Sequence, residues 1–132
     1  MLAVKSPTLV LDLEICKRNI QSMVAKSRQH NVFFRPHFKT HQSAAVAEWF
    51  REQGITAITV SSVSMATYFA DHGWNDITIA FPANLPEAED INRLAERISL
   101  NLLMESEETA QYFADHLTAG CGFFIKIDTG YH

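Results

Sequence analysis

Short apolar runs alternate with helical stretches along most of the chain, and their spacing is the feature that most restricts the fold. The ends of these runs fall 20 to 24 residues apart. A strand, a helix and two short loops occupy about that length, and repetition of this unit implies parallel strands joined by helical crossovers. The expected strands are residues 32–38, 57–60, 77–81, 99–104 and 123–127, and the expected helices are 44–53, 64–72, 86–97 and 106–118.

A lead-in precedes these repeated units. Residues 8–12 are expected to form another short strand, followed by a helix over 14–30. Hydrophobic periodicity predicts a buried stripe on that helix. Its members are Ile15, Ile20, Met23, Val24 and Ser27.

Two architectures fit a run of parallel βα units, the doubly wound sheet and the (β/α)₈ barrel. Near-continuous apolar strands are typical of a sheet that is buried on both faces. Both architectures place their ligands at the carboxyl ends of the strands. Only five strands follow the lead-in, whereas a complete barrel has eight. The chain is therefore expected to be part of a longer protein or the product of a truncated gene.

Composition excludes several classes of protein. The 132 residues are 47% hydrophobic and carry a net charge of −4, with no basic run that could bind nucleic acid. No apolar segment approaches the roughly 20 residues that span a bilayer. Cys16 and Cys121 lack metal-type spacing and are expected to be reduced thiols. These features predict a cytoplasmic protein that interacts with neither nucleic acid nor membrane.

The first repeated strand ends in a cationic segment that reads RPHFKTH over residues 35–41. Strand alternation would send Arg35, His37 and Lys39 to one face. Such groups are costly on a buried sheet face unless a ligand meets them. Desolvation and the neighbouring Arg35 could lower the pKa of the Lys39 amine and make it a nucleophile of the kind that pyridoxal phosphate requires.

The chain resembles the fold-type III pyridoxal-phosphate enzymes with an alanine-racemase-like N-terminal barrel, and most of all the D-threonine aldolase and D-serine dehydratase family. RPHFKTH at 35–41 is the most specific match to this family. Supporting matches are TLVLDL at 8–13 with Arg18-Asn19-Ile20, AITV at 57–60, DITIA at 76–80 and KIDTGYH at 126–132. The resemblance spans nearly the whole chain.

The resemblance implies a role for each candidate residue. Lys39 would hold pyridoxal 5'-phosphate as a Schiff base and act as a catalytic base, with Arg35 and His37 lining the cofactor side of the barrel. His41 and Asp128 are further candidates for the cofactor pocket. For Asp128, a turn residue that bonds backbone amides beside Gly130 is an equal alternative.

The resemblance also implies the organisation of the whole protein. Residues 1–132 would be the N-terminal part of an α/β barrel of the TIM type, with the rest of the barrel and a C-terminal β domain absent. The full-length protein would be a homodimer acting on a small D-amino acid. A divalent metal is compatible with the family, but its ligands would lie outside this chain.

Three functions stay open from the sequence. The first is a lyase or racemase acting on a D-amino acid, by retro-aldol cleavage, β-elimination or racemisation. The second is a non-catalytic protein that binds and buffers pyridoxal phosphate. The third is an inactive fragment.

Overall fold

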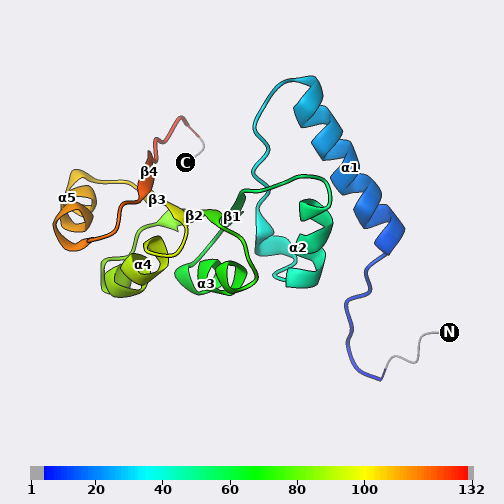
Figure 1. Cartoon of the computed structure of the whole chain (residues 1–132), viewed down its shortest axis with the longest axis horizontal. Coiled ribbons are helices and arrows are strands. Elements are labelled where there is room, and N and C mark those ends of the chain that lie inside the picture. Colours follow the sequence, from blue (N-terminus) through cyan, green and yellow to red (C-terminus); the bar gives the residue numbers. More distant parts are fainter. Residues whose placement is uncertain (1–4, 131–132) are drawn as a thin grey trace. The chain divides into compact units, whose positions relative to one another are not determined.

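The chain divides into two compact units, residues 1–33 and residues 34–132. The computed structural model describes residues 5–130 (Figure 1). Among residues 5–33 the first unit contains one helix, α1 (Leu13–Gln29), whose N-cap Asp12 accepts a hydrogen bond from the amide of Ile15 at 3.0 Å. This bond satisfies one of the amides that an α-helix leaves without a partner at its start.

The second unit is built on a four-stranded parallel sheet in the order β1-β2-β3-β4. The strands are β1 (Ile58–Val60), β2 (Asp76–Pro82), β3 (Ser99–Met104) and β4 (Gly122–Ile125). Sequential neighbours pair at every step, whereas a doubly wound sheet reverses its strand order. The topology is therefore that of a partial (β/α) barrel, as expected from the sequence.

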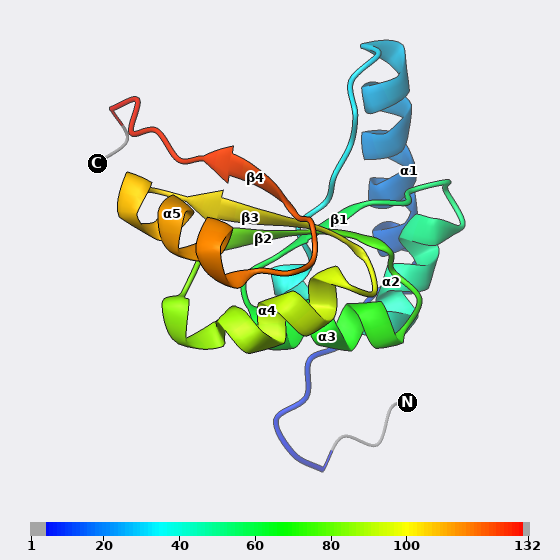
Figure 2. The ribbon, with the colours of Figure 1, turned by 60° about the vertical axis from the view of Figure 1, so that its left-hand side comes forward.

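Helices connect successive strands. They are α2 (Ala44–Arg51), α3 (Val63–Asp71), α4 (Ala88–Ala95) and α5 (Glu107–His116), with short 3₁₀ turns η1 (Phe38–Thr40) and η2 (Leu85–Glu87). Figure 2 shows α3, α4 and α5 lying along one face of the sheet. Strands β1, β2 and β3 supply the apolar layer beneath those helices. That layer includes Ile58, Val60, Ile77, Ile79, Leu100 and Leu102, each at most 4% exposed.

Local sequence determines where the helices begin and end. Ser43, Ser62 and Ser106 each cap a helix by accepting a hydrogen bond from the amide three residues later. Gly54 and Gly73 follow α2 and α3 with φ of +82°, a left-handed conformation that glycine adopts without steric cost. Ser106 is thus the N-cap of α5, and Gly54 and Gly73 end α2 and α3, as these residue types favour.

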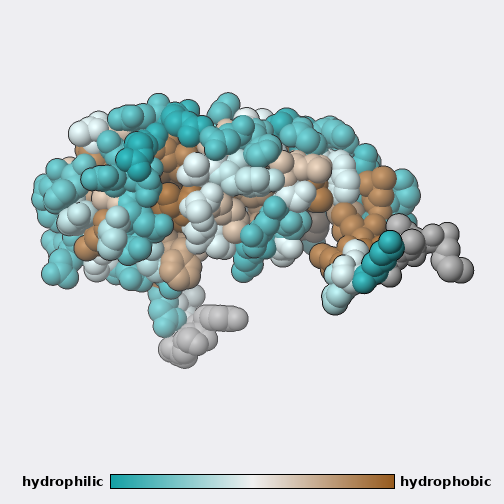
Figure 3. Space-filling model, turned by 90° about the horizontal axis from the view of Figure 1, so that it is seen from below, coloured by the Kyte–Doolittle hydropathy of each residue, from teal (hydrophilic) through white to brown (hydrophobic). Residues whose placement is uncertain are grey.

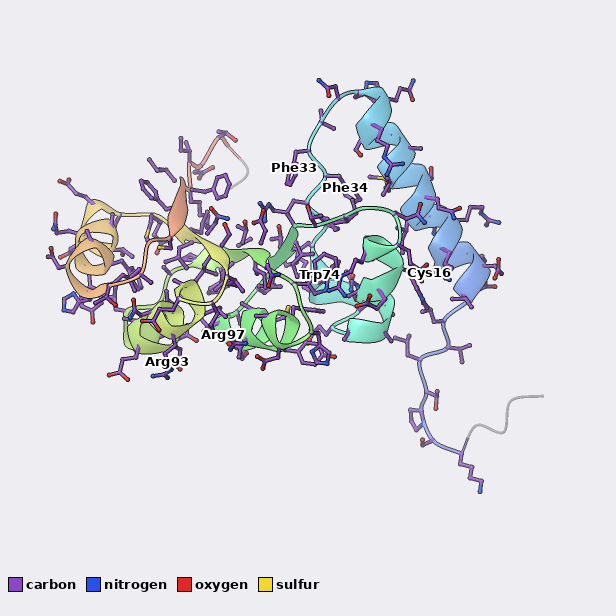
Figure 4. All side chains as sticks on the ribbon, viewed as in Figure 1. Cys16, Phe33, Phe34, Trp74, Arg93 and Arg97 are labelled. Atoms are coloured by element: carbon purple, nitrogen blue, oxygen red, sulfur yellow. The ribbon has the colours of Figure 1, made fainter. Side chains whose placement is uncertain are left out.

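An aromatic cluster anchors the segment before β1. Phe38 is fully buried, and its ring lies 5.0 to 5.2 Å from the rings of Phe50, Phe69 and Trp74. Trp74 is labelled in Figure 4. Because aromatic side chains bury large areas, this cluster fixes the backbone next to Lys39.

Two expected strands are wrong. Residues 32–36 form no ladder, and only one parallel bridge joins His37 to Thr59. Pro36 has no amide hydrogen to donate, so its contribution is a carbonyl that accepts from the Thr59 amide at 2.8 Å. Residues 8–12 are also not a strand, since no neighbouring segment among residues 5–33 forms a ladder with them.

The predicted stripe of α1 is confirmed at Ile20 and Val24, which are 6% and 2% exposed, and is wrong at Ile15 and Met23, which are 45% and 49% exposed. Apolar side chains therefore remain exposed, and Figure 3 shows brown areas on the face of the molecule that it displays. In the second unit the exposed apolar residues include Phe81, Phe123, Phe124, Ile125 and Ile127. Tyr131 and His132, the end of the KIDTGYH segment, lie outside the described residues.

Candidate functional site

Lys39 lies in η1, immediately beyond the point where the chain pairs with β1. Its side chain is exposed, and it forms no ion pair with residues 5–130. The backbone around it is well held, because Gln42 donates a side-chain hydrogen bond to the Lys39 carbonyl at 3.1 Å. The structure thus presents the Lys39 amine from a turn that directly follows His37, the residue that pairs with β1 at the edge of the sheet.

His37 is the N-cap of that turn. Its Nδ1 accepts a hydrogen bond from the Lys39 amide at 3.2 Å. Burial, and secondarily the positive charge of Lys39, lowers the pKa of His37 below its ordinary value. The neutral imidazole is therefore favoured, and His37 and Lys39 are the two predicted site residues that the structure brings into direct contact.

His41 belongs to the aromatic cluster. Its ring lies 4.5 Å from that of Phe38 and stacks on Phe50 at 5.7 Å. Burial lowers the pKa of His41, and its Nε2 is buried without a hydrogen-bond partner among residues 5–130. The ring packs among core side chains, so the described contacts give it a structural role.

Arg35 binds the amino ends of two strands. Its guanidinium donates to the Asp76 carboxylate at 2.7 Å and to the carbonyls of Ile58 and Asp76 at 3.3 and 3.4 Å. Ile58 and Asp76 are the first residues of β1 and β2. Parallel strands carry ligand sites at their carboxyl ends, so these contacts place the guanidinium at the opposite end of the sheet.

Asp128 follows β4, whereas the segment carrying Lys39 pairs with β1 at the other side of the sheet. The Asp128 carboxylate accepts a hydrogen bond from the Gly130 amide at 2.8 Å, and Gly130 has φ of +106°. This is the turn contact that the sequence offered as the alternative to a cofactor role. In the strand order, two strands, β2 and β3, lie between β1, with which the segment before Lys39 pairs, and β4, which Asp128 follows.

A polar row crosses the sheet face opposite the helices. His37 pairs with Thr59, Thr59 with Thr78, and Thr78 with Asn101, and paired residues in parallel strands point to the same face. The hydroxyl of Thr78 is buried without a partner among residues 5–130. Strand alternation could have identified this row, but the sequence alone did not single out Thr59, Thr78 or Asn101.

A pocket of about 420 Å³ opens near the carboxyl ends of β1, β2 and β3. Its lining includes Ser61, Ala83, Asn84 and Glu105, which follow those strands, together with apolar side chains such as Ile79 and Leu102. Within residues 5–130, no group of three or more histidine, cysteine or carboxylate side chains could hold a metal ion. No helix in the same residues is long and apolar enough to cross a membrane.

Residues 11–132 match the sequence model of the family described as "Alanine racemase, N-terminal domain". D-threo-3-hydroxyaspartate dehydratase from Delftia sp. (strain HT23) is 35% identical over 138 residues, which cover 100% of this chain and 36% of that protein. D-threonine aldolase from Arthrobacter sp. is 34% identical over 97 residues, which cover 70% of this chain and 26% of that protein. The chain thus spans about a third of the length of these relatives.

Solved structures show the same fold. The Delftia sp. HT23 dehydratase superposes with a TM-score of 0.91 at 31% identity, over 98% of this chain and 35% of that one. D-threonine aldolase from Filomicrobium marinum superposes with a TM-score of 0.90 at 25% identity, over 96% of this chain and 36% of that one. The matched family model, the relatives and the parallel strand order agree, and the chain belongs to the alanine racemase N-terminal domain family.

Proposed function

We propose that this chain is the N-terminal part of a pyridoxal-phosphate-dependent lyase acting on a D-amino acid, and that Lys39 is the residue to which the cofactor attaches. The observation that carries the proposal is the exposed Lys39 side chain on the turn η1, which His37 caps and which directly follows the pairing of His37 with β1. The relatives include a dehydratase and an aldolase whose names specify D-configured hydroxy amino acids, which supports this class of substrate.

The residues around Lys39 fit such a cofactor. Attachment of an aldehyde requires an amine that the aldehyde can reach. Lys39 meets this condition because its side chain is exposed and forms no ion pair with residues 5–130. The buried, unpartnered hydroxyl of Thr78 is a polar group on the same sheet face as His37, and ligand-binding faces commonly carry such groups.

When bound, pyridoxal phosphate supplies an electron sink that stabilises negative charge developing at the substrate Cα. The chain's own contribution is the nitrogen of Lys39, which would hold the cofactor and, once displaced by the substrate amine, take a proton as a base. His37 fixes the turn that orients this nitrogen. Aldol cleavage, elimination and racemisation all draw on these two roles.

Dimerisation and a cytoplasmic location belong to the same proposal. The composition, with a net charge of −4 and ordinary hydrophobic content, supports the cytoplasmic location, and the family membership supports dimerisation. A variant of the Delftia dehydratase has been solved in a metal-free form. Residues 5–130 of this chain contain no cluster of metal-ligating side chains, so we assign no metal to them.

Reductive labelling tests the attachment site. The purified chain would be incubated with pyridoxal phosphate, treated with borohydride, digested, and analysed by mass spectrometry. Label on Lys39 is the expected result, and it should disappear in Lys39→Ala. The matched control is Lys126→Ala, which removes another exposed lysine and should leave labelling unchanged.

Two other outcomes are informative. Label on Lys5, Lys17, Lys26 or Lys126 instead of Lys39 would refute the assignment. Label on Lys39 in a full-length protein that consumes neither D-threonine nor D-threo-3-hydroxyaspartate would favour the alternative of a non-catalytic protein that stores the cofactor.

A further inference from the structure

His37 stands at one end of the polar row, on the sheet face opposite the helices. Its bridge partner Thr59 is intermediate in exposure, while the neighbours of Thr59 along β1, Ile58 and Val60, are fully buried on the helix side. Because side chains alternate along a strand, His37 shares the face of Thr59. Lys39 follows two residues later. The imidazole therefore lies on the sheet face opposite the helices, two residues before the lysine.

The hydrogen bond between His37 and Lys39 determines which ring nitrogen carries the proton. The Lys39 amide donates to Nδ1 at 3.2 Å, so Nδ1 must present its lone pair. A neutral imidazole has one donor nitrogen and one acceptor nitrogen. The proton of neutral His37 is thereby fixed on Nε2. Full protonation would turn Nδ1 into a donor and break the cap of η1.

The surroundings of His37 favour that neutral form. Burial and the Lys39 charge both lower the pKa of His37. On its own segment the other cation, Arg35, is held by the Asp76 carboxylate at 2.7 Å. Among residues 5–130 no acceptor bonds to Nε2 of His37, and this nitrogen is not buried. The Nε2–H is thus a hydrogen-bond donor that the protein itself leaves available.

We propose that the Nε2–H of His37 donates a hydrogen bond to an anionic oxygen of the ligand held at Lys39, with the donor nitrogen fixed by the Lys39 amide. The inference rests on the proposed function and deepens it. A neutral donor binds the oxyanion through the hydrogen bond itself, without a second positive charge next to Lys39. The backbone of Lys39 thereby orients its neighbour's side chain toward its own ligand.

The oxygen has two possible sources in this chemistry. One is the phenolic oxygen of the cofactor, which is ortho to the aldehyde carbon that Lys39 attacks. The other is the carboxylate of the amino acid substrate. A cofactor analogue methylated on the phenolic oxygen cannot supply the first kind of acceptor, so it separates the two.

The tautomer is measured directly by nitrogen NMR. In the purified chain labelled with ¹⁵N-histidine, the resonances of His37, assigned by comparison with His37→Asn, should show Nδ1 without a proton and Nε2 with one. A proton on Nδ1 at neutral pH would overturn the inference, whatever Lys39 does with the cofactor.

Two substitutions separate capping from donation. Asparagine places an oxygen near the position of Nδ1, so His37→Asn retains the cap of η1 but ends short of Nε2. Glutamine reaches the position of Nε2 with an amide donor, so His37→Gln retains the donor but weakens the cap. The control is His116→Asn, an exposed histidine on α5 whose Nδ1 contacts the Tyr112 carbonyl. All three would be compared with the unmodified chain by circular dichroism to confirm folding.

Reductive labelling of Lys39 gives the functional measurement. His37→Asn should raise the pyridoxal phosphate concentration that gives half-maximal labelling about 10-fold, as expected for loss of one hydrogen bond to a charged acceptor. His37→Gln should recover a large part of that loss, and His116→Asn should match the unmodified chain. With the O-methylated analogue, His37→Asn and the unmodified chain should label alike. If the acceptor is the substrate carboxylate instead, His37→Asn and the unmodified chain should label alike with pyridoxal phosphate. They should then differ only in how strongly a D-amino acid competes with the labelling.

The outcomes distinguish this inference from the proposed function. No label on Lys39 in the unmodified chain would refute both. Label on Lys39 that is equal in His37→Asn, with and without a competing D-amino acid, would refute only the donor role and leave His37 as a cap. An equal loss with pyridoxal phosphate and its O-methylated analogue would likewise overturn donation, because the effect would then act through the position of Lys39.

Discussion

Replacement of Arg35 by methionine removes a cation that contacts three oxygen atoms at the amino ends of β1 and β2. The substitution keeps the length of the apolar stem and deletes the hydrogen bonds to Asp76 and to the Ile58 carbonyl. The side chains of Arg35 and Asp76 are 20% and 35% exposed. Fully exposed ion pairs contribute up to about 1 kcal/mol, and disruption of buried ones costs about 3–5 kcal/mol.

The partial exposure of this pair places Arg35→Met between those limits. We expect the free energy of unfolding to fall by about 2 kcal/mol, which corresponds to a decrease in Tm of roughly 8 °C for a chain of this size. Urea unfolding followed by tryptophan fluorescence is the assay, because Trp74 is only 2% exposed in the folded state. Asp76→Leu and the double variant complete a cycle whose coupling energy should be about 1–2 kcal/mol.

The same variant decides between two interpretations of Arg35. Its contacts with Asp76 and Ile58 predict that folded Arg35→Met labels at Lys39 within about twofold of the unmodified chain. A coupling energy near zero in the cycle would show that the ion pair does not stabilise the fold. A large loss of cofactor labelling in a fully folded variant would instead place Arg35 in the cofactor site, as the strand alternation first suggested.

Two further predictions concern buried and crowded positions. Because burial lowers the pKa of His41, the folded state binds fewer protons at this ring than the unfolded state, so the contribution of His41 to stability is present above about pH 6.5 and is lost as the pH falls. His41→Phe should flatten the decline of the unfolding free energy with falling pH, measured by urea titration. An unchanged dependence of the unfolding free energy on pH would contradict this. A Cβ on Gly122 would lie 2.2 Å from Oδ1 of Asn101, so Gly122→Ala should lower the free energy of unfolding by about 1 kcal/mol in the same assay. The control is Gly120→Ala, whose Cβ would meet nothing within 4 Å and which should change that free energy by less than about 0.5 kcal/mol. Equal effects of the two substitutions would refute the crowding at Gly122.

Local signals in the sequence predicted the elements whose cause is local. The bounds of β3 agree with the expected 99–104, and Ser106 caps α5 as its residue type indicates. Repetition at 20 to 24 residues predicted parallel strands, because that spacing reflects the geometry of one strand and one crossover helix. Spacing alone did not separate a barrel from a doubly wound sheet; the family resemblance implied the barrel, and the strand order β1-β2-β3-β4 agrees with it.

Contacts between distant residues could not be predicted in the same way. Alternation assigned Arg35 to the ligand face, but Asp76, 41 residues later, binds its guanidinium at the amino ends of the strands. The family resemblance made His41 a candidate for the cofactor pocket, and in the structure its ring packs against Phe38 and Phe50. The strand pattern of residues 32–38 ignored Pro36, whose missing amide hydrogen leaves a single bridge to β1.

That single bridge explains how the chain can present Lys39. A residue inside a ladder has both backbone groups committed to neighbouring strands, and its side chain direction is fixed by the pleat. Beyond His37 the ladder stops, and the turn is held by other means, namely the buried Phe38 ring, the His37 cap and the Gln42 bond to the Lys39 carbonyl. Each of these contacts acts on the backbone or on a neighbour of Lys39, so the turn is held in place while the Lys39 side chain stays exposed.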